Sequence, residues 1–333
     1  MATTSTSAVR VRQPSRLLGA FAWGVVAYNI LVILWGAVVR ATGSGAGCGD
    51  HWPLCNGNFV PHHPRLATII EFAHRSMSGI ATILIIGLAV WVFYATPRGE
   101  RSRKSAIASV FFLVTEALLG AALVLGGYVE HNISTARVVM QSIHFTNTMM
   151  LLATLGVTAW WVSQRERTNT PTSANSTLVW PAWMAAISTI VVGATGAVAA
   201  LADTLFPSTS LREGLAADFA ASAPLLVRMR WIHPAAAVVG FCCVLWLAYR
   251  IRSRLSTTVV ALLVLQILLG IVDVLTLAPT WMQIVHLLAA DIYWIALVAL
   301  VADTLWPDRR QRLAMERQVP EGHHEGTLLI NEK

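Results

Sequence analysis

Eight apolar stretches constrain the fold of this chain more than any other feature of its sequence. Each is about as long as the 20 residues that an α-helix needs to cross a bilayer. Only 12% of the 333 residues are charged, against about 25% in soluble proteins. Because backbone polar groups in lipid must bond within their own segment, we predict an all-α integral membrane protein with eight transmembrane helices. They are expected at Leu18–Val39, Ala67–Tyr94, Ala106–Gly126, Val138–Val162, Leu178–Leu201, Leu226–Tyr249, Thr257–Leu277 and Trp281–Thr304.

Basic residues are concentrated on one side of these stretches. If the N-terminus is inside, most of the 24 Lys and Arg residues fall in inner loops and tails. Cytoplasmic loops carry such an excess, so we expect a multi-pass protein of the cell membrane with both termini cytoplasmic. The net charge of +7 then reflects topology. Because the basic residues are spread over separate segments, we expect the lipid bilayer, and no nucleic acid, as a partner.

The two halves of the chain resemble each other. Gly36–Val39 corresponds to part of Gly193–Val198, and Leu119–Val124 corresponds to Leu269–Val274. Four spans return the chain to the same side, so the repeats run parallel. We therefore predict two tandem, pseudo-symmetric four-helix bundles, at 18–162 and 178–304, joined by a cytoplasmic linker at 163–177 and flanked by cytoplasmic tails at 1–17 and 305–333.

Every second apolar stretch carries a histidine near its beginning, at His74, His144, His233 and His286. These spans all run inward, so the four rings are expected at a similar depth near the outer face. A single histidine in a membrane typically bonds a carbonyl of a neighbouring helix, because its nitrogens need partners that lipid cannot supply. Four at equivalent places favour two pairs of axial ligands for haem iron.

The residue three positions before each histidine differs between the halves. Of Glu71, Gln141, Arg230 and Gln283, only Glu71 is a carboxylate. It is a candidate for proton exchange, and the alternative is an interfacial ion pair with Arg75 or Arg40. Arginines near the outer edge are candidates to bind haem propionates as charge-assisted pairs, with interfacial anchoring as the alternative for each. They are Arg40, Arg75, Arg137, Arg228 and Arg230.

The first outer loop is glycine-rich and contains two cysteines, Cys48 and Cys55. The outer side of a membrane allows oxidation, so a disulfide is plausible. A metal site is the weaker interpretation because the loop has no matching second pair of ligands. Cys242 and Cys243 lie within a predicted span and are expected to be small buried apolar residues.

Two segments resemble the haem A synthase family. The first runs from Arg40 through Cys48 to Trp52-Pro53-Leu54-Cys55-Asn56-Gly57, and the second is Glu71-Phe72-Ala73-His74-Arg75. The resemblance extends over about residues 18–305, with the later three histidines in their expected spans. It implies an enzyme that oxidises the C8 methyl group of haem O to a formyl group, giving haem A for terminal cytochrome oxidase.

The resemblance also implies roles for individual residues. His233 and His286 would be axial ligands of a resident haem b, the cofactor, and His74 and His144 would hold the substrate haem. Glu71 would be a catalytic carboxylate, and the two outer-loop cysteines would form the disulfide of the bacterial type. Expected partners are haem O, a haem O synthase and an unidentified electron donor or acceptor.

Two other functions compete with this interpretation. A di-haem membrane cytochrome that only transfers electrons would also place four histidines on four helices, but it needs neither Glu71 nor the cysteine loop. A transporter would be expected to have broken helices at the membrane midplane, whereas the histidines are predicted near the outer face.

Overall fold

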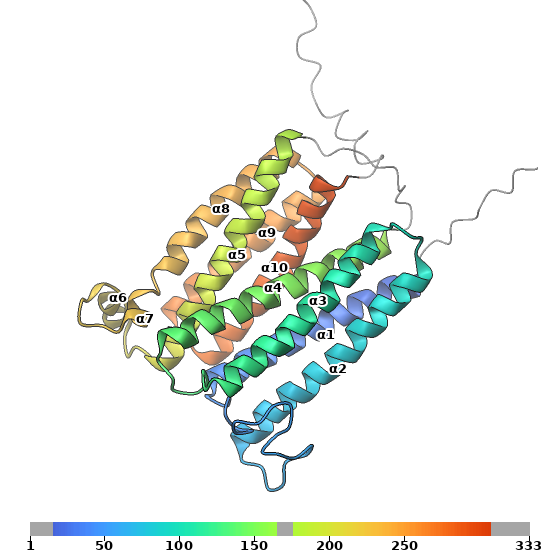
Figure 1. Ribbon diagram of the computed structural model, residues 1–333. Helices are drawn as coiled ribbons and strands as arrows, with labels where there is room; N and C mark the ends of the chain where they lie inside the picture. The colour runs from blue at the N-terminus through green and yellow to red at the C-terminus, as the bar shows by residue number, and fades with distance from the viewer. Residues whose placement is uncertain (1–15, 165–175, 308–333) are drawn as a thin grey trace, which may run out of the picture.

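The computed structural model describes residues 16–164 and 176–307, and those residues form ten α-helices and no β-strand (Figure 1). Most of the two predicted tails and of the predicted linker lies outside the described residues. The helices are α1 (Arg16–Ala41), α2 (Leu66–Ala95), α3 (Arg101–Leu125), α4 (Thr135–Ser163), α5 (Ser176–Leu205), α6 (Leu211–Phe219), α7 (Leu225–Arg228), α8 (Ile232–Ile251), α9 (Arg254–Leu275) and α10 (Thr280–Leu305).

Seven helical segments in the described part of the chain are long and apolar enough to cross a membrane. They are α1, α2, α3, α5, α7 with α8, α9 and α10. The protein is therefore a multi-pass membrane protein. The other long helix, α4, has 29 residues but lacks an equally apolar stretch of that length. It packs against α1, α3, α5 and α10 and lies between α3 and α5 (Figure 1), so much of its surface faces protein and need not be apolar.

The sixth predicted span is not one continuous helix. Instead of a helix from Leu226 to Tyr249, the short α7 ends at Arg228 and α8 begins at Ile232. Arg230 lies in the turn between α7 and α8, where it forms ion pairs with Asp203 of α5 and Asp218 of α6. Pro234 follows in the first turn of α8, where a missing backbone N–H is tolerated.

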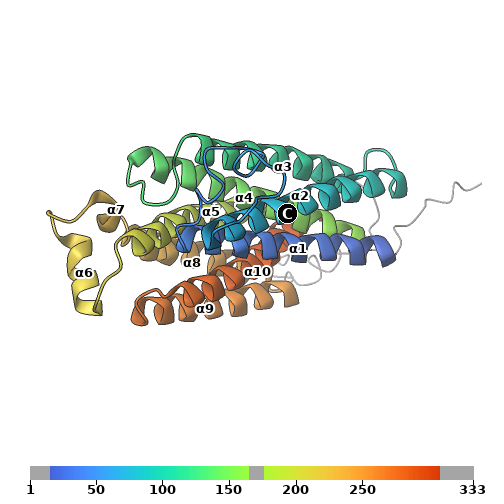
Figure 2. The same cartoon turned by 90° about the horizontal axis from the view of Figure 1, so that it is seen from below.

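The first four long helices pack in a closed sequence, α1 with α2, α2 with α3, α3 with α4, and α4 with α1. The helices α5, α8, α9 and α10 do the same. Contacts of α4 and α1 with α5 and α10 join the two sets. The loop after α1 and the helices α6 and α7 lie at the same end of the long helices (Figure 1), and Figure 2 shows α6 and α7 projecting from that end.

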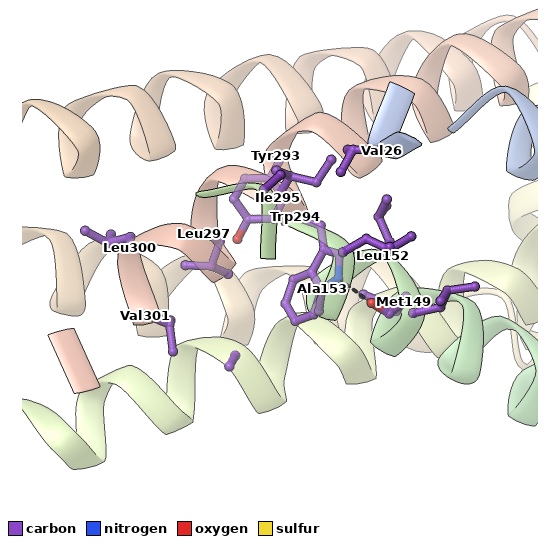
Figure 3. Packing of buried hydrophobic residues seen from close by; sticks show 14 of the residues in the cluster. Val26, Met149, Leu152, Ala153, Tyr293, Trp294, Ile295, Leu297, Leu300 and Val301 are labelled. Carbon is purple, nitrogen blue, oxygen red and sulfur yellow. Dashed lines mark hydrogen bonds between the residues drawn. The ribbon is translucent and has the colours of Figure 1, made fainter. Parts of the chain in front are cut away.

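Large side chains of α4 and α10 interlock where the two sets meet (Figure 3). The Trp294 indole is 3% exposed and donates from Nε1 to the backbone oxygen of Met149 at 2.8 Å. Leu152 and Leu297 are buried in the same cluster. Lipid is as apolar as these side chains, so close packing and hydrogen bonds supply the association between membrane helices. The junction thereby fixes the two sets of helices relative to each other.

Candidate functional site

Each of the four predicted ligand histidines packs against a glycine on another long helix. The pattern is the same four times, and the glycines belong to the repeated small-residue segments of the sequence. The pairs are His74 of α2 with Gly36 of α1, His144 of α4 with Gly120 of α3, His233 of α8 with Gly196 of α5, and His286 of α10 with Gly270 of α9.

A methyl group in place of three of these glycines would collide with the imidazole ring. An ideal Cβ on Gly196, Gly270 or Gly36 would lie 2.9, 3.0 or 3.1 Å from Cε1 of its histidine. At Gly120 the distance would be 3.9 Å, which is ordinary contact. The glycines therefore form cradles that admit an imidazole ring between two closely packed helices.

His233 and His286 lie next to each other as a pair, in a T-shaped arrangement. Their ring centroids are 6.5 Å apart and their planes are at 86°. With a metal–imidazole bond of about 2 Å, two rings on opposite sides of one metal ion have centres about 6 Å apart. The Nδ1 atom of His233 lies 3.1 Å from the backbone oxygen of Val192, so Nε2 is the nitrogen left for a metal. The Nε2 atom of His286 lies 3.1 Å from Nε2 of Gln266.

His74 and His144 both belong to the first set of helices, on α2 and α4. The Nδ1 atoms of both, and that of His286, are buried without a hydrogen-bond partner in the described part of the chain. Buried polar atoms without a partner are rare in native proteins. The unpaired nitrogens of His74 and His286 and the four cradles fit two haem groups, because haem iron needs only two ligands from the protein. No group of three or more His, Cys, Asp or Glu suited to a bare metal ion occurs within the described ranges.

Glu71 is fixed to the loop that follows α1. Its side chain is buried, and Oε2 accepts a hydrogen bond from the backbone N–H of Cys48 at 2.7 Å. Oε1 accepts from Arg75, with Nε at 3.0 Å and Nη2 closer. Arg75 also donates from Nη1 to the backbone oxygens of His51 and Leu54, each at 2.7 Å. The ion pair with Arg75, one of the two arrangements expected for Glu71, is thus present, and it anchors the loop.

The same loop contains the Cys48–Cys55 disulfide, which confirms that prediction. The loop is seated on the first turn of α2, where the Thr68 hydroxyl donates to the backbone oxygen of Gly47 at 2.7 Å. A Cβ on Gly47 would lie 2.4 Å from the backbone of Ala67, so only glycine allows this approach. Of the other two cysteines, Cys243 is buried as expected and Cys242 is exposed.

Arg40, a candidate propionate ligand, joins the two sets of helices. Its Nη1 donates to the backbone oxygen of Ala200 and the hydroxyl of Thr204, both at 2.6 Å, and Nη2 donates to Oε1 of Gln283 at 2.7 Å. Gln283 precedes His286 by three residues on α10. Arg75 is engaged by Glu71, as described above. Arg228 is exposed, and its side chain has no hydrogen bond or ion pair within the described residues.

The remaining two candidate arginines are fastened within the protein. Arg137 is 3% exposed and donates to backbone oxygens of the loop at 130–132. Arg230 forms ion pairs with Asp203 at 2.9 Å and Asp218 at 2.7 Å. These contacts place both guanidinium groups at the end of the helices where the histidines lie.

The structure adds a residue that the sequence reasoning missed. Glu116 of α3 lies inside the membrane region, with Oε1 3.6 Å from Nδ1 of His144. Its carboxylate accepts hydrogen bonds from Nδ2 of Asn147 at 2.6 Å and from the hydroxyl of Thr148 at 2.5 Å. Glu71 is therefore not the only carboxylate beside the first histidine pair.

A signal for Glu116 was present in the repeat. Glu116 precedes Gly120 by four residues, and Gln266 precedes Gly270 by four. Extending the alignment of the two glycine segments by one helical turn would have matched a carboxylate with an amide on the helix face next to a histidine.

Comparison with known proteins identifies the family of the chain. Residues 19–298 match the COX15-CtaA family model, described as cytochrome oxidase assembly protein. The chain belongs to this family. The resemblance to haem A synthases is thereby confirmed.

Similar curated proteins carry two names. Over 299 residues the chain is 41% identical to Protoheme IX farnesyltransferase of Thermus thermophilus, with 87% of this chain and 49% of that protein covered. It is 42% identical over 112 residues to Heme A synthase of Geobacillus kaustophilus, covering 34% of this chain and 35% of the relative. For Heme A synthase of Bacillus cereus the identity is 49% over 100 residues, covering 29% and 32%. The chain spans about half the length of the Thermus relative.

Proposed function

We propose that this protein is a haem A synthase, a membrane oxidoreductase that converts the C8 methyl group of haem O to a formyl group. The observation that carries the proposal is the fourfold use of one arrangement, a histidine ring held against a glycine of another helix. Membership of the family and its relatives named heme A synthase support the same assignment. The conversion of a methyl to a formyl group removes four electrons and adds one oxygen atom.

We propose further that the eight long helices are transmembrane and form two tandem four-helix bundles, at 18–162 and 178–304. The closed packing sequence within each set supports this division, as does the internal position of α4. The distribution of basic residues supports cytoplasmic termini, including the tails at 1–17 and 305–333, and a cytoplasmic linker at 163–177 in a cell-membrane protein.

The two histidine pairs are assigned different haems. His233 and His286 hold a resident haem b, and the 6.5 Å separation of their ring centroids supports this assignment. His74 and His144 hold the haem O substrate. Bound haem supplies one-electron redox chemistry at its iron. The protein side chains hold the two groups at a fixed separation, because the junction of α4 and α10 is closely packed.

Glu71 is proposed as a catalytic carboxylate that accepts a proton released at the substrate. Its place one helical turn before His74 supports this role. Its hydrogen bonds to Arg75 and to the Cys48 amide hold the carboxylate in one position. Propionate binding is proposed for the five arginines named above. Arg228 is exposed and lacks an acidic partner in the described part of the chain, whereas Arg75 and Arg230 would have to share their guanidinium groups with carboxylates.

The proposed reaction requires partners. A haem O synthase would supply the substrate, and the name of the Thermus relative, a protohaem farnesyltransferase, supports such a relationship. An electron donor or acceptor must exchange electrons with the resident haem.

Chromatography of extracted haems tests the proposal directly. The full-length chain is expressed in cells supplied with haem O, beside a His144→Ala control. We expect haem A from the unchanged protein and none from the control. If the unchanged protein holds two haems and yields no haem A, it is a di-haem cytochrome and the proposal is wrong.

A further inference from the structure

The repeat places chemically different residues at one equivalent position. Glu116 on α3 and Gln266 on α9 each lie four residues before a glycine that cradles a histidine. Each also contacts that histidine. Glu116 Oε1 is 3.6 Å from Nδ1 of His144, and Gln266 Nε2 is 3.1 Å from Nε2 of His286. The first histidine pair thus has a carboxylate beside one ligand, where the second pair has a neutral amide.

The Glu116 carboxylate is held in place from α4. Asn147 and Thr148, which donate to it, lie three and four residues after His144 and so share its helix face. Asn147 is itself fixed, because its Nδ2 also donates to the backbone oxygen of Phe112 at 2.9 Å. Asn147 donates from Nδ2, and the Thr148 hydroxyl lies between Oε1 of Glu116 and the backbone oxygen of His144, which is 2.9 Å away. The Oε1 atom of Glu116 also lies next to the Nδ1 atom of His144.

We propose that Glu116 is a positioning residue that orients His144 and lowers the reduction potential of the haem bound there, relative to the haem bound by His286. The proposal rests on the proposed function, because it requires His144 to be an axial ligand. A metal-bound imidazole usually donates its other N–H to a carboxylate or carbonyl, which fixes the ring and makes it a stronger ligand. At 3.6 Å the contact is longer than a hydrogen bond and within the distance of an ion pair. A negative charge beside the ligand stabilises ferric over ferrous iron.

Exchanging the two residues tests this inference. The full-length protein in detergent is loaded with ferric haem b as the probe and titrated potentiometrically, as are Glu116→Gln, Gln266→Glu and the control Glu130→Gln. Glu130 is an exposed residue of the same half. The redox component that disappears from the titration of His144→Ala is the haem bound by His74 and His144.

We expect Glu116→Gln to shift that component to a more positive potential, with a change of about tenfold in the preference for ferric iron, equivalent to about 59 mV for one electron. Its affinity for ferric haem should fall by about 10- to 100-fold, as for other residues that support metal ligands. Gln266→Glu should shift the other component to a more negative potential. Glu130→Gln should leave both unchanged.

Three results would overturn the inference. The first is an unchanged potential in Glu116→Gln with reduced thermal stability, which would make Glu116 a structural link between α3 and α4. The second is an equal shift of both components. The third is the absence of any component that depends on His144, which would also refute the proposed substrate site, whereas the first two leave that site intact.

Discussion

Replacing Gly196 with alanine should weaken haem binding without unfolding the protein. The added methyl carbon would lie 2.9 Å from Cε1 and 3.2 Å from Nδ1 of His233. Carbon atoms pack best at about 3.5–4.0 Å, so the ring must withdraw by roughly 0.6 Å or more. Gly120→Ala is the matched control, because its methyl carbon would lie 3.9 Å from His144.

The size of the loss in haem affinity depends on what holds the His233 imidazole in place. In the haem-free protein the imidazole can rotate away, and alanine improves helix propensity by about 1 kcal/mol, so thermal stability should be retained. In the haem-bound protein the ring is tied to iron, and ligand distances tolerate only about 0.2 Å. Overpacking of this kind costs about 1–3 kcal/mol, which corresponds to a loss of roughly 5- to 150-fold in affinity.

Absorbance titration of the haem-stripped, full-length variants with haem b measures this effect. We expect the resident site of Gly196→Ala to lose affinity within that range. The sites of Gly120→Ala should both match the unchanged protein. Gly196→Ala with unchanged haem affinity would refute the cradle as a constraint on the ligand. Equal losses in both variants would show that the effect does not depend on the contact with histidine.

Three further predictions concern the ligands, the loop and Glu71. His286→Ala should abolish the low-spin bis-histidine spectrum, whereas His144→Ala should block product formation and leave most of the resident haem; equal loss of resident haem in both would contradict the division of roles. Cys48 and Cys55 should resist alkylation in intact-mass analysis until a reductant is added, and labelling of both without reductant would disprove the bond in the cell. Glu71→Gln should lower turnover per bound haem by about 10²–10⁴-fold, the usual contribution of a general base, while haem occupancy measured by extraction stays near normal. A normal yield of haem A would remove Glu71 from the catalytic residues.

Long apolar segments made most of the fold predictable. A helix is the one element that satisfies its own backbone in lipid, so each span follows from local composition. The break between α7 and α8 was not predictable in this way. It depends on Arg230 meeting Asp203 and Asp218, which are distant in sequence and come together only in the folded protein.

The candidate site likewise has a part that the sequence predicts and a part that only the folded structure shows. The histidines and the glycines of their cradles follow each other in a repeated order, which the sequence displays. The partners of the polar groups do not. Arg40 was assigned to propionates from its position near the outer edge, and the structure also gives it bonds to Thr204 and Gln283 on the other set of helices. Glu116 was overlooked because its importance arises from its distance to His144, a contact between helices.

In each half of the chain, a residue three positions before a histidine anchors a neighbouring segment to the helices. Three residues before His74 stands Glu71, which accepts from the Cys48 amide. Three residues before His233 stands Arg230, which donates to the backbone oxygen of Gly214 at 3.0 Å. The two side chains have opposite charges, yet each fastens the loop of its own half to the end of the helices. Glu71 therefore has a structural task that Glu71→Gln would also disturb.

Thr68→Val separates the structural task of Glu71 from catalysis. It removes the hydroxyl that donates to the Gly47 carbonyl and leaves the carboxylate with its own partners. The Gly47 carbonyl then keeps only the longer contact with Nδ2 of Asn56 at 3.4 Å, and the loss of one hydrogen bond costs about 0.5–1.5 kcal/mol, so the loop should loosen and thermal stability should fall. If Glu71 accepts a proton, turnover per bound haem in Thr68→Val should stay within about threefold of the unchanged protein, far from the effect of losing a general base. If turnover falls as far as in Glu71→Gln, attachment of the loop accounts for both variants and the carboxylate has no separate chemical role.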